Sequence, residues 1–278
     1  MDGSPSQARK TFAALVRRRS ESIPLDESAL LVAAEEYPDL DVGKYLARLD
    51  VLADHIREDV DNADDPRTAG VLLARFLYEA EGFQGNPDDY YDPRNSFLNE
   101  VIDRRRGIPI TLSILFIEVA RRLGIAAHGV GLPGHFLVRL EEAGTYVDPF
   151  TGEVDLHDSD CAERVRAIHG DDMPFERSML AAQSNRQILT RVLRNLREIY
   201  RARKDSTREL AALDRIVLLR AGDPQPLRER ARFLGTLGEY RRALRDVEHI
   251  RRLQPSLRRS ERFREWRRFI RDMAARMN

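Results

Sequence analysis

Hydrophobic positions recur at helical spacing through the first hundred residues of the chain. Apolar residues three and four positions apart predict helices over 26–36, 40–60, 66–81 and 96–104, after a short basic helix over 11–20. Asp26 is expected to cap the helix that begins there. Residues 83–95 are rich in Gly, Pro, Asn and Asp, which predicts a loop.

The pattern changes from helix to strand near the middle of the chain. Pro109 suits the first turn of a helix over 109–123, because no hydrogen bond awaits its missing N–H there. Alternating positions then predict three strands, over 126–130, 136–140 and 145–147. A helix followed by antiparallel strands predicts an α+β fold for this part of the chain.

The remainder of the chain, from about residue 186, has helical periodicity to its end. Residues 212–224 and 243–255 share the same order of Ala, Leu and β-branched positions and the same closing Pro, at an offset of 31 residues. This pattern resembles the tetratricopeptide repeat, although an ordinary helical bundle is the alternative. The prediction is therefore a flexible tail at 1–25, an α+β domain at 26–185 and an all-α domain at 186–278.

Charge is distributed unevenly although the chain as a whole is neutral. Residues 190–278 contain 25 basic and 12 acidic side chains, and residues 1–189 contain 21 and 34. The two parts therefore carry net charges of +13 and −13. Two surfaces of opposite sign are the simpler interpretation, and a nucleic-acid partner for the basic part is the alternative.

Several classes of protein are disfavoured by what the sequence lacks. It has no run of 18 apolar residues and no apolar signal-peptide core, so no membrane span and a cytoplasmic location are predicted. The single Cys161 cannot form an intramolecular disulfide. The acidic runs lack EF-hand spacing, the histidines are scattered, and no P-loop occurs, so no metal site and no cofactor are predicted.

The candidate chemistry lies between residues 90 and 152. In papain-type sites a nucleophile sits at a helix start, a histidine on a following strand takes its proton, and an acidic or amide side chain orients the histidine. The helix predicted at 109–123, then His135, then Asp148 occur in that order. Because His135 and Asp148 flank one predicted hairpin, their side chains are expected to meet.

These segments resemble the transglutaminase-like superfamily, and more closely its SirB-type branch of bacterial proteins with a tetratricopeptide tail. The resemblance covers about 26–255 and is carried by Tyr-Tyr-Asp-Pro-Arg-Asn-Ser at 90–96, Arg-Gly-Ile-Pro-Ile at 106–110 and Gly-Leu-Pro-Gly-His-Phe at 131–136. It implies a papain-like core and places the nucleophile position on Pro109, which cannot act as one. The branch implies no particular reaction.

Other residues are weaker candidates for catalysis. The hydroxyls of Thr111 and Ser113 lie in the first turns of the predicted helix. One interpretation is that either acts as a nucleophile activated by His135; the other is that each satisfies a free backbone group at the helix start. The thiol of Cys161 follows two aspartates, which should raise its pKa and reduce its reactivity.

The helix that precedes the nucleophile position supplies the candidate binding residues. Asn95, Asn99 and Glu100 are predicted to line the cleft together with His135, with helix capping as the alternative role for Asn95.

Three functions remain open from the sequence. The first is a non-catalytic protein whose transglutaminase-like cleft and repeat groove bind a protein or peptide. The second is a hydrolase or acyltransferase that uses the Thr111 or Ser113 hydroxyl with His135 and Asp148. The third is nucleic-acid binding through the arginine-rich stretch 258–271, in which three aromatic residues recur at helical spacing.

Overall fold

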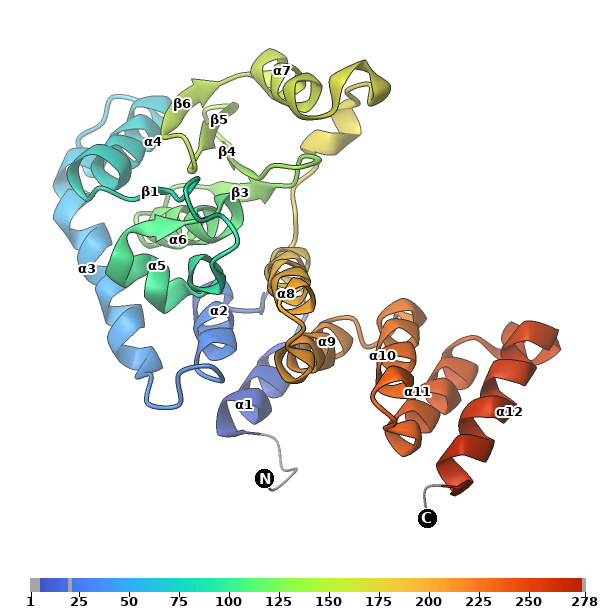
Figure 1. The fold of residues 1–278 in the computed structure, drawn as a ribbon. Helices are drawn as coiled ribbons and strands as arrows, with labels where there is room; N and C mark the ends of the chain where they lie inside the picture. Colours follow the sequence, from blue (N-terminus) through green and yellow to red (C-terminus); the bar gives the residue numbers. More distant parts are fainter. Residues whose placement is uncertain (1–5, 20–21, 277–278) are drawn as a thin grey trace. The chain divides into compact units, whose positions relative to one another are not determined.

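The computed structural model describes residues 6–19 and 22–276, and the chain divides into two compact units, 1–192 and 193–278 (Figure 1). The sequence predicted a boundary between residues 185 and 186. The observed division lies between residues 192 and 193, within helix α8 (Asn185–Ala202). The two units are described separately below.

Helices form the first half of the first unit. They are α1 (Gln7–Leu15), α2 (Leu25–Ala33), α3 (Val42–Asp61), α4 (Pro66–Arg75), a π-helical turn at Phe76–Ala80, a 3₁₀ turn at Pro93–Ser96, α5 (Leu98–Arg104) and α6 (Pro109–Arg122). The helices predicted from periodicity over 40–60, 66–81 and 109–123 therefore all form, with small shifts at their ends.

The N-terminal segment differs from the flexible tail predicted over 1–25. Residues 1–5 lie outside the described residues, but Ser6 caps α1 by accepting a hydrogen bond from the Arg9 N–H. Phe12 of α1 is fully buried, and α1 packs against α2. Burial of the Phe12 ring stabilises the packing of α1 on the core. The polar composition of the N-terminal segment does not indicate this burial.

A four-stranded antiparallel sheet follows α6 in the order β3 (Ala127–Val130), β4 (Leu137–Leu140), β5 (Thr145–Asp148) and β6 (Glu153–Leu156). The first three strands were predicted. The fourth was missed because two of its residues, Glu153 and Asp155, are acidic, which is uncommon in strands, and Asp155 has a left-handed conformation.

Helix α6 packs against β3 and β4 and occupies the centre of this unit (Figure 1). Every residue from Pro109 to Ala120 is buried, so α6 has no solvent-facing side along that stretch. After the sheet come α7 (Asp158–His169) and two 3₁₀ turns, at Gly170–Asp172 and Arg177–Leu180. Helix α6 is thus buried against two strands of the sheet.

The second unit is helical. Helix α8 (Asn185–Ala202) leads into α9 (Ser206–Leu219), α10 (Pro224–Thr236), α11 (Tyr240–Leu253), a 3₁₀ turn at Pro255–Arg259 and α12 (Glu261–Arg276). Consecutive helices from α9 to α12 pack on one another. The equivalent alanines of the two similar stretches, Ala212 and Ala243, are both buried, which permits close helix approach. None of the described helices is long and apolar enough to cross a membrane.

A cluster of buried charges joins α2 to α6. Asp26 does not cap α2 as predicted, because Pro24 precedes the helix and Asp26 lies buried in its first turn. Its carboxylate accepts from Arg122 at 2.8 Å. Burial and the adjacent Asp26 charge raise the pKa of Glu118 from 4.5 to about 7, whereas the Arg122 guanidinium holds the Asp26 pKa below its ordinary value.

Substitution of Glu118 by Gln should therefore change the pH dependence of stability. A carboxyl whose pKa is raised on folding stabilises the fold below its unfolded pKa, and that contribution is lost as pH rises through about 7. Urea unfolding at pH 5 and pH 8 should show the wild-type chain losing up to about 3 kcal/mol relative to Glu118→Gln over that interval. The exposed Glu58→Gln variant is the control, and a pH-independent difference would contradict the assignment.

Candidate functional site

The start of α6 is the position where the sequence predicted a missing nucleophile. Pro109 is the first residue of the helix, preceded by Ile108 at the cap position, and both side chains are buried. A proline ring there carries no ionisable atom. The positive end of the helix dipole thus faces a residue that cannot become a thiolate.

A two-residue strand connects this helix start to the loop after β5. Strand β1 (Gln84–Gly85) pairs in parallel with β2 (Arg106–Gly107), just before α6. The Gly85 N–H donates to the Phe150 carbonyl oxygen at 3.1 Å, and a Cβ atom on Gly85 would lie 2.5 Å from the Phe150 ring. The absence of a side chain at Gly85 therefore allows the Asp148–Phe150 loop to approach the start of α6.

His135 is positioned by the turn that leads into β4. Gly134 adopts a left-handed conformation, with φ of 72°, and the His135 N–H donates to the Leu132 carbonyl at 3.2 Å. Arg191 of α8 donates to the His135 carbonyl oxygen at 2.7 Å. The His135 ring meets the Phe150 ring edge to face, with centroids 6.4 Å apart. The histidine is thus fixed through both its backbone and its ring.

The structure brings His135 and Asp148 together, as the hairpin order predicts. The Nε2 atom of His135 lies 2.7 Å from Oδ2 of Asp148, at the end of β5. Asp148 is fully buried, whereas the His135 side chain remains 12% exposed. The same Oδ2 atom lies 2.9 Å from a terminal nitrogen of Arg164 on α7, and Oδ1 accepts from the Phe150 N–H at 2.9 Å.

These partners decide the charge state of Asp148. Burial alone would raise the pKa of its carboxyl, but the His135 hydrogen bond and charge, the Arg164 guanidinium and the Phe150 N–H hold that pKa below its ordinary value. Asp148 is therefore an anion at neutral pH, with its lone pairs committed to protein groups. It orients the imidazole ring through the contact with Nε2.

Replacement of Asp148 by Asn should destabilise the fold by about 3–5 kcal/mol at pH 7, because His135 and Arg164 lose a buried anionic partner. A carboxyl whose pKa is depressed on folding contributes stability above its unfolded pKa and loses it as pH falls through the folded value. Urea unfolding should thus show a full difference at pH 7 and a smaller one below about pH 4.

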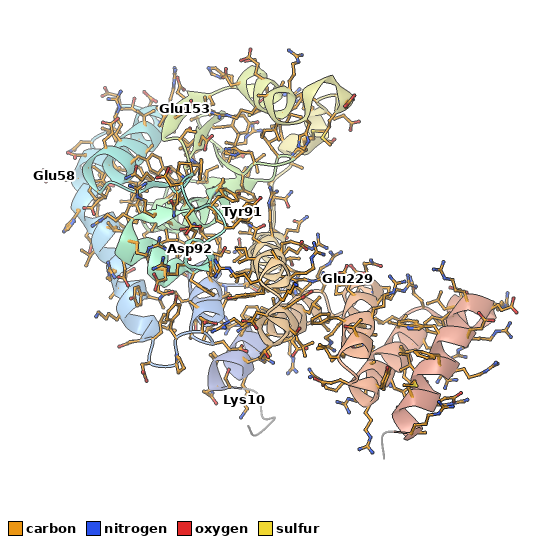
Figure 2. The ribbon with its side chains drawn as sticks, in the orientation of Figure 1. Lys10, Glu58, Tyr91, Asp92, Glu153 and Glu229 are labelled. Atoms are coloured by element: carbon orange, nitrogen blue, oxygen red, sulfur yellow. The ribbon has the colours of Figure 1, made fainter. Side chains whose placement is uncertain are left out.

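The matched control is Glu153→Gln, which removes the other carboxylate partner of Arg164, at the start of β6 (Figure 2). Glu153 is largely exposed, so its loss should cost about 1 kcal/mol or less. Equal losses in the two variants would contradict a special role for the buried carboxylate.

Neither candidate hydroxyl is directed at His135. Thr111 donates to the Asn95 carbonyl oxygen at 2.7 Å and accepts from the Ile108 N–H at 3.2 Å. Ser113 donates to the Pro109 carbonyl oxygen at 2.8 Å. Each hydroxyl thus satisfies backbone groups around the first turn of α6, which is the structural role expected there.

The three predicted binding residues occupy different settings. Asn95 accepts from the Asn86 side chain at 3.1 Å and donates to the Asp89 carbonyl at 2.7 Å, so it organises the preceding loop. It does not cap the following helix, because Phe97 occupies the N-cap position of α5 and no described side chain caps that helix. Asn99 is buried, and its side-chain oxygen has no hydrogen-bond partner among the described residues.

Glu100 faces a different neighbourhood. It is half-buried, and its charge acts on Tyr45 and on Arg94. Among the described residues, no hydrogen bond or ion pair joins it to His135. Its predicted role in lining the site therefore receives no support from these contacts.

Three residues that surround the pair were not found from the sequence: Arg164, Arg191 and Tyr78. The Tyr78 hydroxyl is buried without a hydrogen-bond partner among the described residues, and burial with the Asp148 charge raises its pKa well above the ordinary value. Its ring stacks on Phe116 of α6, with centroids 6.3 Å apart. All three come from elements distant in sequence, and no local pattern marks them.

Cys161 is the one cysteine of the chain, and it lies buried on α7 in a cluster with Tyr146, Leu137 and Val165. Burial first, and then the charges of Asp158 and neighbouring acids, raise its pKa to about 12. The thiol is therefore protonated at neutral pH and belongs to the core.

Iodoacetamide should consequently label Cys161 slowly in the folded chain. At pH 8 the rate should be on the order of a hundredfold or more below that of the same chain in urea, as followed by mass spectrometry. Comparable rates in the two conditions would show that the thiol is accessible and reactive.

Acidic side chains elsewhere act as caps and ion-pair partners. Asp65 accepts from two N–H groups at the start of α4, and Asp92 pairs with Arg94 and Arg104. Over residues 6–19 and 22–276, no group of three or more His, Cys, Asp or Glu side chains is arranged to hold a metal ion.

Comparison with known proteins identifies the family of the chain. The model of the transglutaminase-like superfamily matches residues 43–194, more than half of the chain. The protein therefore belongs to the transglutaminase-like superfamily. It also belongs with the UPF0162 proteins, because two of them match at least 70% of its length.

The relatives include a UPF0162 protein of Xylella fastidiosa, which is 39% identical over 241 residues, covering 85% of this chain and 86% of the relative. A UPF0162 protein of Pseudomonas aeruginosa is 33% identical over 195 residues, covering 70% and 72%. Human F-box only protein 21 is 44% identical over 63 residues, which is 23% of this chain and 10% of that protein. No solved structure matches the chain.

Proposed function

We propose that this protein binds a peptide or protein segment at His135, which Asp148 orients, and does not catalyse acyl transfer there. The observation that carries the proposal is Pro109 at the first position of α6, in a chain whose histidine–aspartate pair is intact. A side chain with no transferable proton cannot be activated by His135, so the pair has no nucleophile to serve at that position.

The proposal gains support from the state of the nearby hydroxyls. An enzyme that used Thr111 or Ser113 would need one of these oxygens within hydrogen-bond reach of His135. Both hydroxyls instead donate to backbone carbonyl oxygens, Thr111 to that of Asn95 and Ser113 to that of Pro109. Activation would require each side chain to abandon a buried hydrogen bond, which disfavours the hydrolase or acyltransferase alternative.

The groups around His135 suit a peptide. Asp148 uses the Nε2 atom, so Nδ1 is left without a hydrogen-bond partner among the described residues. Phe150 contacts His135, and Tyr90 contacts both Phe150 and Tyr91. Tyr90 is 37% and Tyr91 71% exposed. A histidine nitrogen beside partly exposed aromatic rings offers one polar and one apolar contact, the combination that interfaces favour.

The narrower assignments belong to the same proposal. The motifs at 90–96, 106–110 and 131–136 support membership of the SirB-type branch. The similar stretches at 212–224 and 243–255, each ending at a proline, support tetratricopeptide-like packing of α9 to α12. Such repeats commonly offer a second protein-binding surface.

Selection of displayed random peptides on the full chain would test the proposal. Peptides that bind the wild-type chain should bind His135→Ala at least about tenfold more weakly, because the variant lacks the histidine contact. His55→Ala is the matched control, since His55 is exposed on α3. Amine incorporation and peptide hydrolysis by the wild-type chain should remain at the level of a protein-free blank.

Two outcomes would overturn the proposal. The first is turnover of an amine donor or peptide that His135→Ala abolishes. The second is a set of selected peptides that bind both variants with equal affinity.

A further inference from the structure

The second unit contains a pocket that lies outside the His135 site. Helix α10, the 3₁₀ turn at Pro255–Arg259 and the start of α12 enclose a volume of about 410 Å³. Three arginines, a serine and three apolar side chains line it. No carboxylate belongs to the lining. The pocket therefore combines positive charge with apolar surface.

The positive charge of this pocket is not neutralised by the fold. Arg232 and Arg262 are exposed, and among the described residues neither forms an ion pair with a carboxylate. Arg228 donates to the Gln254 side-chain oxygen at 2.6 Å, a neutral partner. Arg230 on the same helix differs, because Asp214 and Asp246 both bind it.

The apolar wall of the pocket is firmly packed. Phe263 is only 6% exposed and belongs to the core of the unit. It contacts Trp266 edge to face, with ring centroids 5.9 Å apart. Trp266 is half-buried and Leu257 packs on the same core. This wall offers a preformed surface for one apolar side chain, and preformed surfaces lose little entropy on binding.

We propose that this pocket binds an acidic peptide segment in which carboxylate side chains flank an apolar one. The carboxylates would accept hydrogen bonds from Arg232 and Arg262, whose planar guanidinium groups match carboxylate geometry. The apolar side chain would lie against Trp266. The proposal does not rest on the His135 site, since none of its residues belongs to that site.

A peptide fits the surroundings better than nucleic acid does. A nucleic-acid strand needs a continuous cationic track along its phosphates. The exposed carboxylates of Glu261 and Glu265 interrupt the arginines of α12, and Arg267 is paired with Glu248. The pocket itself places guanidinium groups beside a packed apolar wall at one bounded site, which suits carboxylates and an apolar side chain on a short segment.

The chain contains a single tryptophan, Trp266, so its fluorescence reports on this pocket directly. The full chain would be titrated at low salt with an acetylated Leu-Asp-Leu-Glu-Leu peptide and with its neutral Leu-Asn-Leu-Gln-Leu counterpart. The acidic peptide should produce a saturable change in emission. The neutral counterpart should bind at least about tenfold more weakly, because it lacks the charge-assisted hydrogen bonds.

Substitution of Arg232 and Arg262 tests whether the change in Trp266 emission reports binding to these two side chains. Arg232→Gln and Arg262→Gln should each weaken binding of the acidic peptide about tenfold. Arg268→Gln removes an exposed arginine of the same helix that does not line the pocket, so its affinity should match the wild-type value. Circular dichroism would establish that the variants remain folded.

The proposal is overturned if the acidic peptide gives no saturable change, or if the neutral peptide binds equally well. It is also overturned if an oligothymidylate strand binds more tightly than the acidic peptide and loses affinity in the same two variants. That last result would assign the pocket to nucleic acid.

Discussion

The first unit depends on the burial of one anion, the Asp148 carboxylate. A fully buried carboxylate is tolerated only where charge and hydrogen bonds compensate its lost hydration. Three parts of the chain supply that compensation: the turn before β4 through His135, α7 through Arg164, and the loop after β5 through the Phe150 N–H. The carboxylate thereby ties the sheet to the helix that follows it, and it aligns the imidazole in the same step.

The residues around the start of α6 have structural roles. Glycine at position 85 lets the Phe150 loop close against the segment that leads into α6, and Thr111 and Ser113 satisfy backbone groups of the first turn. Pro109 then begins the helix without an unsatisfied N–H. The transglutaminase-like domain thus has a proline at the first position of α6, while Nδ1 of His135 has no hydrogen-bond partner among the described residues.

In the second unit, some arginines are paired with carboxylates and others are not. It is rich in arginine, yet arginines such as Arg197, Arg230 and Arg267 are held by carboxylates within the unit. Net charge therefore says little about where an anion would bind. The pocket beside Trp266 combines an apolar wall with guanidinium groups that meet no acid among the residues that the structure describes. Local pairing, and not composition, determines which part of a basic surface can accept a ligand.

The sequence by itself determined the long helices, the first three strands of the sheet and the order of Pro109, His135 and Asp148, because periodicity, turn residues and motif order are local properties. Tertiary structure decided the remainder. It placed α1 in the core through Phe12, turned Asp26 from a cap into a buried partner of Arg122, and recruited Arg164, Arg191 and Tyr78 to the site. These contacts join segments that are distant in the sequence, and burial and charge compensation in the folded chain determine them. No local sequence pattern therefore predicts them.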